Sequence, residues 1–240
     1  MSAGLPRVHQ TRFFPNKKRA RFSNKIAGSL SKGGHPFQPI PRPMSDLTPP
    51  PVWWNGQLLP ESEAHLSVQS QGWLWGRGLF ETIAIRDNQA LALTRHLARL
   101  HASAPRLGLQ PPDESTLRDA IAAVLADCPP TPHRLRLTLT GAEAPGLDLT
   151  PTPGQLLIRR QPMESAQPAE PAILLTVPWR RNEFSPLSGI KSTSYAENAI
   201  ALAHVKERDA TEALFLNTAG DLCEGAVSNL FLIKDENVFT

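Results

Sequence analysis

Lys191 and Glu224 are the two residues of this sequence whose types and surroundings best suit chemistry. The lysine lies in a Ser/Gly-rich segment, residues 188–198, and the glutamate lies in a second segment, residues 221–231. A lysine amine forms a Schiff base with an aldehyde when burial or neighbouring charges lower its pKa. A carboxylate can hold the nitrogen of a bound pyridinium ring in its charged form, so that the ring accepts electrons from a reacting group. The pair therefore suits covalent aldehyde chemistry.

Spacing alone does not identify a cofactor. Most lysines and glutamates are exposed, so composition alone favours a solvated loop lysine at 191 and a turn carboxylate at 224. The two segments nevertheless resemble the signature regions of the fold-type IV pyridoxal-phosphate enzymes, which include branched-chain and D-amino-acid aminotransferases and aminodeoxychorismate lyase. The resemblance runs from about Trp53 to Thr240, and its motifs occur in the expected order.

The resemblance implies pyridoxal 5′-phosphate as the cofactor and a role for several residues. Lys191 would carry the cofactor as a Schiff base and would move a proton between substrate and cofactor. Glu224 would face the pyridine nitrogen, and the hydroxyl of Tyr195 would contact the 3′-oxygen of the ring. Tyr195 is the single tyrosine of the chain, and its alternative role is packing at the start of a helix.

Four further residues match family positions. Arg99 matches the helical arginine that binds the cofactor phosphate, and a guanidinium fork suits that dianion. Taken alone, an arginine on an amphipathic helix usually lies on a solvated face. Ser228 and Asn229 follow Glu224 in the family's order and would shape the loop beside the cofactor. Phe80 lies where the small domain of the family lines the substrate side.

The sequence departs from the family at three places. Ser194 stands where the family usually has asparagine, and Arg77 stands where it usually has an acid. An arginine at 77 could alter carboxylate recognition or a dimer contact. After the position of Thr240 the family continues with a Gly-rich turn and a helix N-terminus that donate amides to the phosphate. We therefore expect an incomplete second domain that binds the cofactor poorly.

The resemblance favours 4-amino-4-deoxychorismate lyase, which yields 4-aminobenzoate and pyruvate in folate synthesis, or a close aminotransferase. Residues 79–83 and 185–191 look most like the lyase branch. The alternatives are a branched-chain or D-amino-acid aminotransferase and, from another class, a truncated non-catalytic relic or binding protein. The expected substrate is a small amino compound, and the expected assembly is a homodimer.

Composition limits the class of protein. The 240 residues, of which 40% are hydrophobic, suffice for one or two domains with a core. No stretch is long and apolar enough to cross a bilayer, so no membrane partner is expected. Cys128 and Cys223 lie far apart, in no metal-ligand spacing, which favours a reduced, cytoplasmic protein without a metal site. Cys223 is expected to be a small buried thiol on a strand.

The positive net charge comes from the first part of the chain. Residues 1–50 contain nine of the 25 Lys/Arg residues but one of the 22 Asp/Glu residues, so the remainder is acidic. An acidic body argues against nucleic acid as the main ligand. Residues 1–50 are expected to be a disordered basic leader, a targeting segment, or sequence read from a misassigned start before Met44.

Hydrophobic periodicity predicts an α+β protein of two domains. A small α/β domain is expected at 51–160, a Pro-rich linker at 161–171, and the first part of the cofactor-binding domain, a pseudo-barrel in the family, at 172–240. The Asn55-Gly56 pair predicts a hairpin turn, and Thr94 and Asp113 are candidate helix N-caps. Strands are expected at 52–59 (as a hairpin), 79–86, 90–93, 134–139, 155–160, 172–177, 212–217, 222–224 and 229–234, and helices at 95–107, after 113, and at 195–208.

Overall fold

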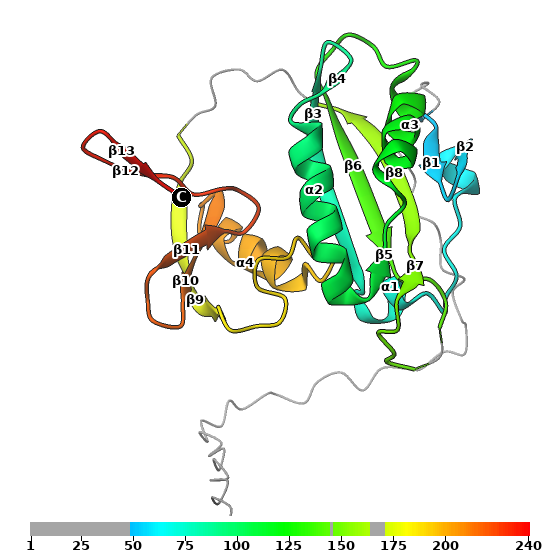
Figure 1. Ribbon diagram of the computed structural model, residues 1–240. Coiled ribbons are helices and arrows are strands. Elements are labelled where there is room, and N and C mark those ends of the chain that lie inside the picture. Colours follow the sequence, from blue (N-terminus) through cyan, green and yellow to red (C-terminus); the bar gives the residue numbers. More distant parts are fainter. Residues whose placement is uncertain (1–48, 145, 164–170) are drawn as a thin grey trace, which may run out of the picture. The chain divides into compact units, whose positions relative to one another are not determined.

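The computed structural model describes residues 49–144, 146–163 and 171–240. Nearly all of the leader predicted for residues 1–50 lies outside these residues, and so does most of the linker predicted for residues 161–171. The described residues form two larger sheets, and each sheet has its own hydrophobic core (Figure 1). The mixture of helices and strands confirms the predicted α+β class.

The first sheet has six strands in the order β2-β1-β8-β6-β3-β4. Neighbouring strands in it pair antiparallel, and β6 pairs along its whole length with both β3 and β8. Its strands are β1 (Val52–Trp54), β2 (Gln57–Leu59), β3 (Gly78–Arg86), β4 (Gln89–Ala90), β6 (His133–Thr140) and β8 (Gln155–Pro162).

This sheet contains two tight turns, and the one predicted at Asn55-Gly56 is confirmed. Asn55 and Gly56 have φ values of 46° and 96°, the left-handed conformations that a type I′ turn between β1 and β2 requires. Asp87 and Asn88, with φ values of 48° and 61°, turn β3 into β4. Strand β4 is shorter than predicted because the chain already enters a helix at Leu93.

Helices α2 (Leu93–Ser103) and α3 (Glu114–Leu125) lie on one face of the sheet (Figure 1). The predicted cap of α3 is confirmed, because the Asp113 carboxylate accepts the Thr116 N–H at 2.7 Å. The predicted cap at Thr94 is wrong. Helix α2 starts at Leu93, two residues before the predicted Arg95, and it follows Ala92, whose left-handed backbone (φ 54°) begins the helix without a side-chain cap.

The core of this part lies between the sheet and the two helices. In β6 the buried residues Leu135, Leu137 and Leu139 alternate with Arg134, Arg136 and Thr138, which point to the opposite face of the sheet, as a half-covered sheet requires. The largest side chains with at most 2% exposure in this core are Leu79, Ile83, Ile85, Leu97, Leu100, Leu109, Leu117, Ile121, Leu135, Leu137, Leu139 and Ile158.

The second larger sheet has three strands in the order β11-β10-β9. Strands β9 (Leu174–Arg181) and β10 (Glu212–Asn217) are parallel, and helix α4 (Ala196–Lys206) lies between them in sequence. Strand β11 (Leu222–Gly225) pairs antiparallel with β10. A parallel pair needs a crossover connection, and α4 provides it. The small core contains Val177, Ala201, Val205, Ala210, Ala213, Phe215 and Ala226.

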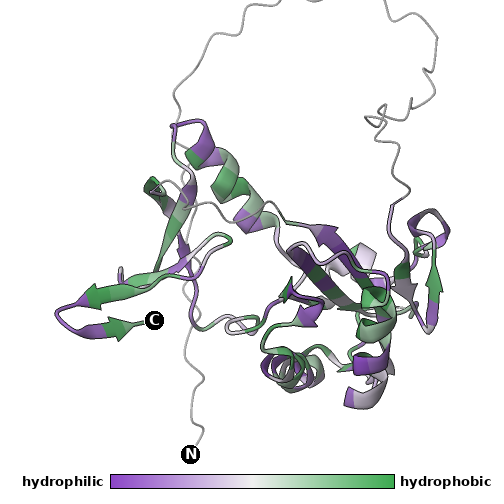
Figure 2. Cartoon of the chain, turned by 90° about the horizontal axis from the view of Figure 1, so that it is seen from above, coloured by the Kyte–Doolittle hydropathy of each residue, from purple (hydrophilic) through white to green (hydrophobic). Residues whose placement is uncertain are grey.

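Apolar side chains are exposed near the end of the described chain. The hairpin of β12 (Leu232–Lys234) and β13 (Asn237–Phe239) has hydrophobic side chains that are more than half exposed, and Figure 2 shows its hydrophobic residues near the C-terminus. Cys223, predicted as buried, is also exposed. The reason is that β11 is the edge strand of its sheet, with a face that no described residue covers.

The remaining elements are short. Strands β5 and β7 pair with each other in parallel, and a 3-10 turn that contains Pro105 follows α2 and ends at Gly108. These elements are β5 (Leu109–Gln110), β7 (Thr152–Pro153), α1 (Gln71–Trp75) and the 3-10 turns Glu61–Glu63 and Ala104–Leu107.

We expect Leu137→Ala to destabilise the protein by about 2–5 kcal/mol, because the side chain is fully buried in the centre of the six-stranded sheet. Leu58→Ala, at a leucine that is 45% exposed on β2, is the matched control and should change stability far less. Urea unfolding measures both. Equal losses for the two variants would contradict the assigned core.

Candidate functional site

The segment around Lys191 is docked on the start of β3 by backbone hydrogen bonds. The Phe80 N–H donates to the Lys191 carbonyl at 3.0 Å, and the Thr193 N–H donates to the Gly78 carbonyl at 2.8 Å. The Thr193 hydroxyl donates to the Gly76 carbonyl at 3.0 Å. These bonds hold the backbone on both sides of the lysine, so the position of its side chain is set by a strand rather than by a free loop.

Two glycines make this docking possible. A Cβ atom on Gly78 would lie 2.6 Å from the Thr193 hydroxyl oxygen, and one on Gly76 would lie 2.6 Å from that of Ser194. Gly76 also has a left-handed backbone, with φ 64°. The Ser194 hydroxyl donates to the Gly76 carbonyl at 3.1 Å. Ser194, a departure from the family pattern, therefore helps to hold the segment in place.

The Lys191 amine lies among aromatic and cationic groups. Its Nζ atom is 4.5 Å from the centre of the Phe80 ring. Burial lowers the pKa of Lys191, and the positive charges of Arg99 and Arg136 lower it further, while two carboxylates act in the opposite direction. A lowered pKa leaves more of the amine neutral, which is the form that attacks an aldehyde.

Phe80 is the side chain around which this site is built. It is buried, and the Tyr195 ring meets it edge-on with centroids 5.2 Å apart. The Arg136 guanidinium carbon lies 3.8 Å from the centre of the same ring. Burial raises the pKa of the Tyr195 hydroxyl, with a smaller contribution from the Glu224 charge, so this hydroxyl remains a hydrogen-bond donor at neutral pH. The structure thus brings together Lys191, Tyr195 and Phe80, three of the residues that the resemblance assigns to the site, and adds Arg136.

Arg99 is held by a buried carboxylate. Its Nε and one terminal nitrogen donate to the two oxygens of Glu81 at 2.7 and 2.5 Å, and Glu81 is almost fully buried. The ring of His96 lies 2.7 Å from the same carboxylate. Among the described residues no side chain binds the other terminal nitrogen of Arg99, which is therefore available to an anion. The hydrogen bonds that Arg99 donates to Glu81 raise the pKa of Arg99, so the guanidinium stays charged.

Glu224 lies on β11 and is oriented by an arginine that sequence reasoning missed. The Arg181 Nε atom is 2.7 Å from a Glu224 carboxylate oxygen. Its N–H does not point along this line, so the contact is an ion pair rather than a hydrogen bond. Arg181 also bonds Glu197 at 2.6 Å and lies over the Phe215 ring. Glu224 itself is half exposed, and its charge helps to raise the pKa of Tyr195.

The loop after Glu224 is fixed by a second buried carboxylate. Glu212 accepts the Ser228 hydroxyl at 2.5 Å and the Ala226 N–H at 3.0 Å. The Asn198 amide donates to the Ala226 carbonyl at 2.5 Å. Ser228 thus shapes the loop, in agreement with its predicted structural role, whereas Asn229 is exposed and its side chain makes no hydrogen bond to any described residue.

The Arg77 side chain bonds loops away from Lys191, which argues against the expectation that it alters carboxylate recognition. It is 5% exposed and donates to the backbone carbonyls of Leu107 at 2.7 Å, Gly108 at 2.6 Å and Asp148 at 3.2 Å. Its guanidinium also contacts the side-chain oxygen of Gln71. Burial lowers the pKa of Arg77, but its carbonyl partners satisfy the charged form. Arg77 thus joins the loop at Leu107 and Gly108 to the loop at Asp148.

Two kinds of feature are absent from residues 49–144, 146–163 and 171–240. No three His, Cys, Asp or Glu side chains come together in a way that could hold a metal ion. No helix there combines the length and the apolar character needed to cross a membrane.

Comparison with known proteins decides the family. A family model described as amino-transferase class IV matches residues 78–240, which is more than half of the chain. This chain belongs to the class IV aminotransferase family. The match includes Phe80, Arg99, Lys191, Tyr195 and Glu224, and the resemblance to fold-type IV enzymes is confirmed.

Similar proteins agree with this assignment. A D-alanine aminotransferase from Bacillus licheniformis is 26% identical over 197 residues, covering 79% of this chain and 67% of the relative. A bifunctional aminodeoxychorismate lyase / D-amino acid transaminase from Mycobacterium tuberculosis is 27% identical, covering 77% and 66%. A crystal structure of a branched-chain aminotransferase from the archaeon Thermoproteus uzoniensis, with norvaline, has 26% identity and a TM-score of 0.71, covering 78% and 66%. The chain spans about two thirds of the length of these relatives.

Class IV aminotransferases depend on pyridoxal 5′-phosphate, and the residues of this chain fit that cofactor. The group offers an aldehyde, a phosphate and a pyridine nitrogen. The chain offers a lysine with a lowered pKa, the free terminal nitrogen of Arg99, and the Glu224 carboxylate. The donor set matches each part of the cofactor in chemical type.

We expect Lys191 to titrate at a lower pH than the amine of N-acetyl-lysine amide. Arg136→Gln should raise the pKa of Lys191, because it removes one of the positive charges that lower it. Competitive labelling with trace acetic anhydride at several pH values, followed by peptide mapping, measures both. A Lys191 amine that titrates like the free compound would contradict its burial.

Proposed function

We propose that this protein is a pyridoxal-phosphate-dependent enzyme that acts on a small amino compound, with Lys191 as its catalytic residue. The observation that supports this most is the placement of the Lys191 amine. Backbone bonds to β3 fix it beside Phe80, and burial and two arginines lower its pKa. Lys191 would bind the cofactor, release it to the incoming amine, and then carry a proton to and from the substrate carbon.

The neighbouring residues would each hold one part of the cofactor. Arg99 would bind the phosphate, since Glu81 fixes its guanidinium and leaves one terminal nitrogen free. Glu224, oriented by Arg181, would pair with the pyridine nitrogen. Tyr195 would donate its hydroxyl to the ring oxygen, and Ser228 and Asn229 would shape the loop beside it.

Arg136 and Phe80 would form the substrate side. The Arg136 guanidinium is half-buried over Phe80 and forms no ion pair with a carboxylate among the described residues. Burial lowers the pKa of Arg136, so a negatively charged group beside its guanidinium would stabilise the charged form. A carboxylate on the substrate would supply that partner, close to the Lys191 amine, and amino acids carry such a group.

Within this class we propose 4-amino-4-deoxychorismate lyase, with folate synthesis as its context, because residues 79–83 and 185–191 look most like that branch. An aminotransferase for branched-chain or D-amino acids is the second candidate, favoured by the names of the relatives. Product analysis separates them. Aminodeoxychorismate should yield 4-aminobenzoate and pyruvate with a lyase, whereas D-alanine or leucine with 2-oxoglutarate should yield glutamate with an aminotransferase.

We also propose that the protein is a cytoplasmic homodimer, as the family resemblance implies. Analytical ultracentrifugation of the cofactor-loaded protein tests the assembly, and a monomer at micromolar concentration would contradict it.

We expect Glu224→Gln to cut turnover on the order of a hundredfold or more, with cofactor binding largely intact, because a neutral amide cannot stabilise the charged pyridine nitrogen. Steady-state kinetics and the visible absorbance of the bound cofactor measure the two effects. Glu236→Gln, on the turn between β12 and β13, is the matched control. Unchanged turnover in Glu224→Gln would refute the role.

We expect Arg136→Gln to raise KM for the amino substrate by about 10- to 100-fold, the usual range for one lost hydrogen-bonded charge pair. Arg95→Gln, an exposed arginine on α2, makes the same change of charge and should leave KM unaltered. If the two variants have the same KM, Arg136 does not bind the substrate carboxylate.

A further inference from the structure

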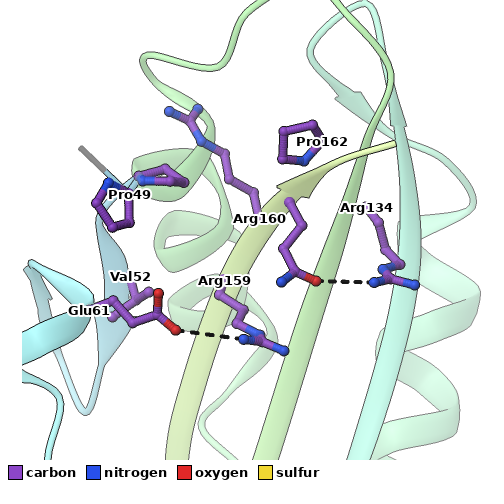
Figure 3. Close-up of a pocket in the computed structure, with 9 residues that line it drawn as sticks. Pro49, Val52, Glu61, Arg134, Arg159, Arg160 and Pro162 are labelled. Carbon is purple, nitrogen blue, oxygen red and sulfur yellow. Dashed lines mark hydrogen bonds and ion pairs between the residues drawn. The ribbon is translucent and has the colours of Figure 1, made fainter. Parts of the chain in front are cut away.

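A cavity of about 470 Å³ lies beside the end of β8, away from the residues assigned to the cofactor. Three of its lining residues are Arg134, Arg159 and Arg160 (Figure 3). Arg134 pairs with Ala84 near the end of β3, whereas the Lys191 segment docks at Gly78 and Phe80, where β3 begins. The cavity therefore lies toward the other end of these strands from the lysine, and its nearest residue to the site is Arg159, which lies opposite Arg136 on the neighbouring strand.

The cavity opens because β1 stops pairing with β8. Trp53 lies opposite Ile158, so continuing this register would place Pro51 opposite Arg160. Pro49, Pro50 and Pro51 have no backbone N–H and cannot extend the ladder. The edge of β8 beyond Ile158 is therefore lined by proline residues instead of a paired strand. The cavity at this edge has polar groups from β8 and apolar groups from the prolines.

The arginines of this cavity are incompletely paired. Arg160 is 8% exposed, and while one terminal nitrogen donates to the Asp127 carbonyl at 3.0 Å, the other is buried without a partner among the described residues. Arg159 lies 3.6 Å from Glu61, and both side chains are partly exposed, so this pair is weak. Arg134 donates to the neutral Gln161 amide at 3.1 Å. One carboxylate thus faces three guanidinium groups.

Figure 3 shows how these groups surround the strand. The Arg160 side chain reaches toward Pro49 on one side of β8, and Arg159 and Arg134 lie on the other side. The alternation of side chains along a strand requires this arrangement. Apolar contacts come from Val52 and the proline rings. Positive charge on both sides of an edge with apolar walls suits an anion that also has an apolar part.

We propose that this cavity is a second ligand site, which binds a small organic anion with one phosphate or carboxylate group and an apolar body. Arg159 and Arg160 would hold the anionic group from the two sides of the open edge of β8, because guanidinium groups form charge-assisted hydrogen bonds with phosphates and carboxylates. Val52 and the prolines would contact the apolar body. A bare inorganic ion would fill only a small part of the volume.

Phenyl phosphate is the probe, titrated into the cofactor-loaded protein so that the cofactor phosphate site is already filled. Isothermal calorimetry should show saturable binding of one molecule per chain. Arg159→Gln and Arg160→Gln should each weaken it about tenfold or more, as expected for a lost charge-assisted bond. Arg95→Gln, the same change of charge at an exposed arginine outside the cavity, should have no effect.

The proposal would be overturned if phenyl phosphate did not bind, or if Arg95→Gln weakened its binding as much as the cavity variants do. It would also be overturned if Arg136→Gln removed binding and Arg159→Gln left it intact, because the probe would then occupy the substrate side. Inorganic phosphate and benzoate are the comparison ligands. Inorganic phosphate that binds as tightly as phenyl phosphate would contradict the role of the apolar walls. Because Arg160 is buried, thermal unfolding checks the fold of its variant, and the partly exposed Arg159 decides the result if that variant unfolds.

Discussion

The site depends on the hydrogen bonds that join residues 191–193 to the start of β3. The pair between Phe80 and Lys191, and the pair between Gly78 and Thr193, bring a segment from after the predicted linker onto a strand from before it. Only glycine at positions 76 and 78 leaves room for the Ser and Thr side chains of the docked segment. Without this contact Lys191 would be separated from Phe80, Arg99 and Arg136, and its amine would lose the surroundings that lower its pKa.

Two buried carboxylates organise the charges around that contact. Glu81 fixes Arg99, and Glu212 fixes the loop that follows Glu224. Burying a carboxylate is costly unless hydrogen bonds satisfy it, and here each accepts two or more. As a result, Arg99 and the loop after Glu224 are held at fixed positions. Burial and the charges of Arg99 and Arg136 together lower the pKa of the Lys191 amine, to which no described residue forms a side-chain hydrogen bond.

The sequence predicted the local features well because their causes are local. The Asn55-Gly56 turn and the Asp113 cap depend on residues within three positions of each other. The cap at Thr94 failed because the left-handed Ala92, which no propensity favours, starts the helix earlier. The burial of Cys223 was wrong because it depended on whether β11 has a neighbour on its outer side.

Long-range partners were beyond the reach of sequence reasoning. Arg181 lies 43 positions before Glu224, and Glu212 holds Ser228 across a turn and a strand. From the sequence, Arg136 is expected on the polar face of a half-buried strand. The residues next to it in the sequence do not show that its guanidinium lies over the Phe80 ring. The family motifs supplied Lys191, Glu224, Arg99 and Tyr195, whereas the residues that position them became visible only in three dimensions.

The most direct test of the central proposal is to locate the covalent link to the cofactor. Reduction of the cofactor-loaded protein with borohydride, followed by proteolysis and mass spectrometry, should place a single pyridoxyl group on Lys191. The variant Lys191→Ala should remain unlabelled. A pyridoxyl group on Lys206 or Lys234 instead, with Lys191 unmodified, would contradict the assignment of the site.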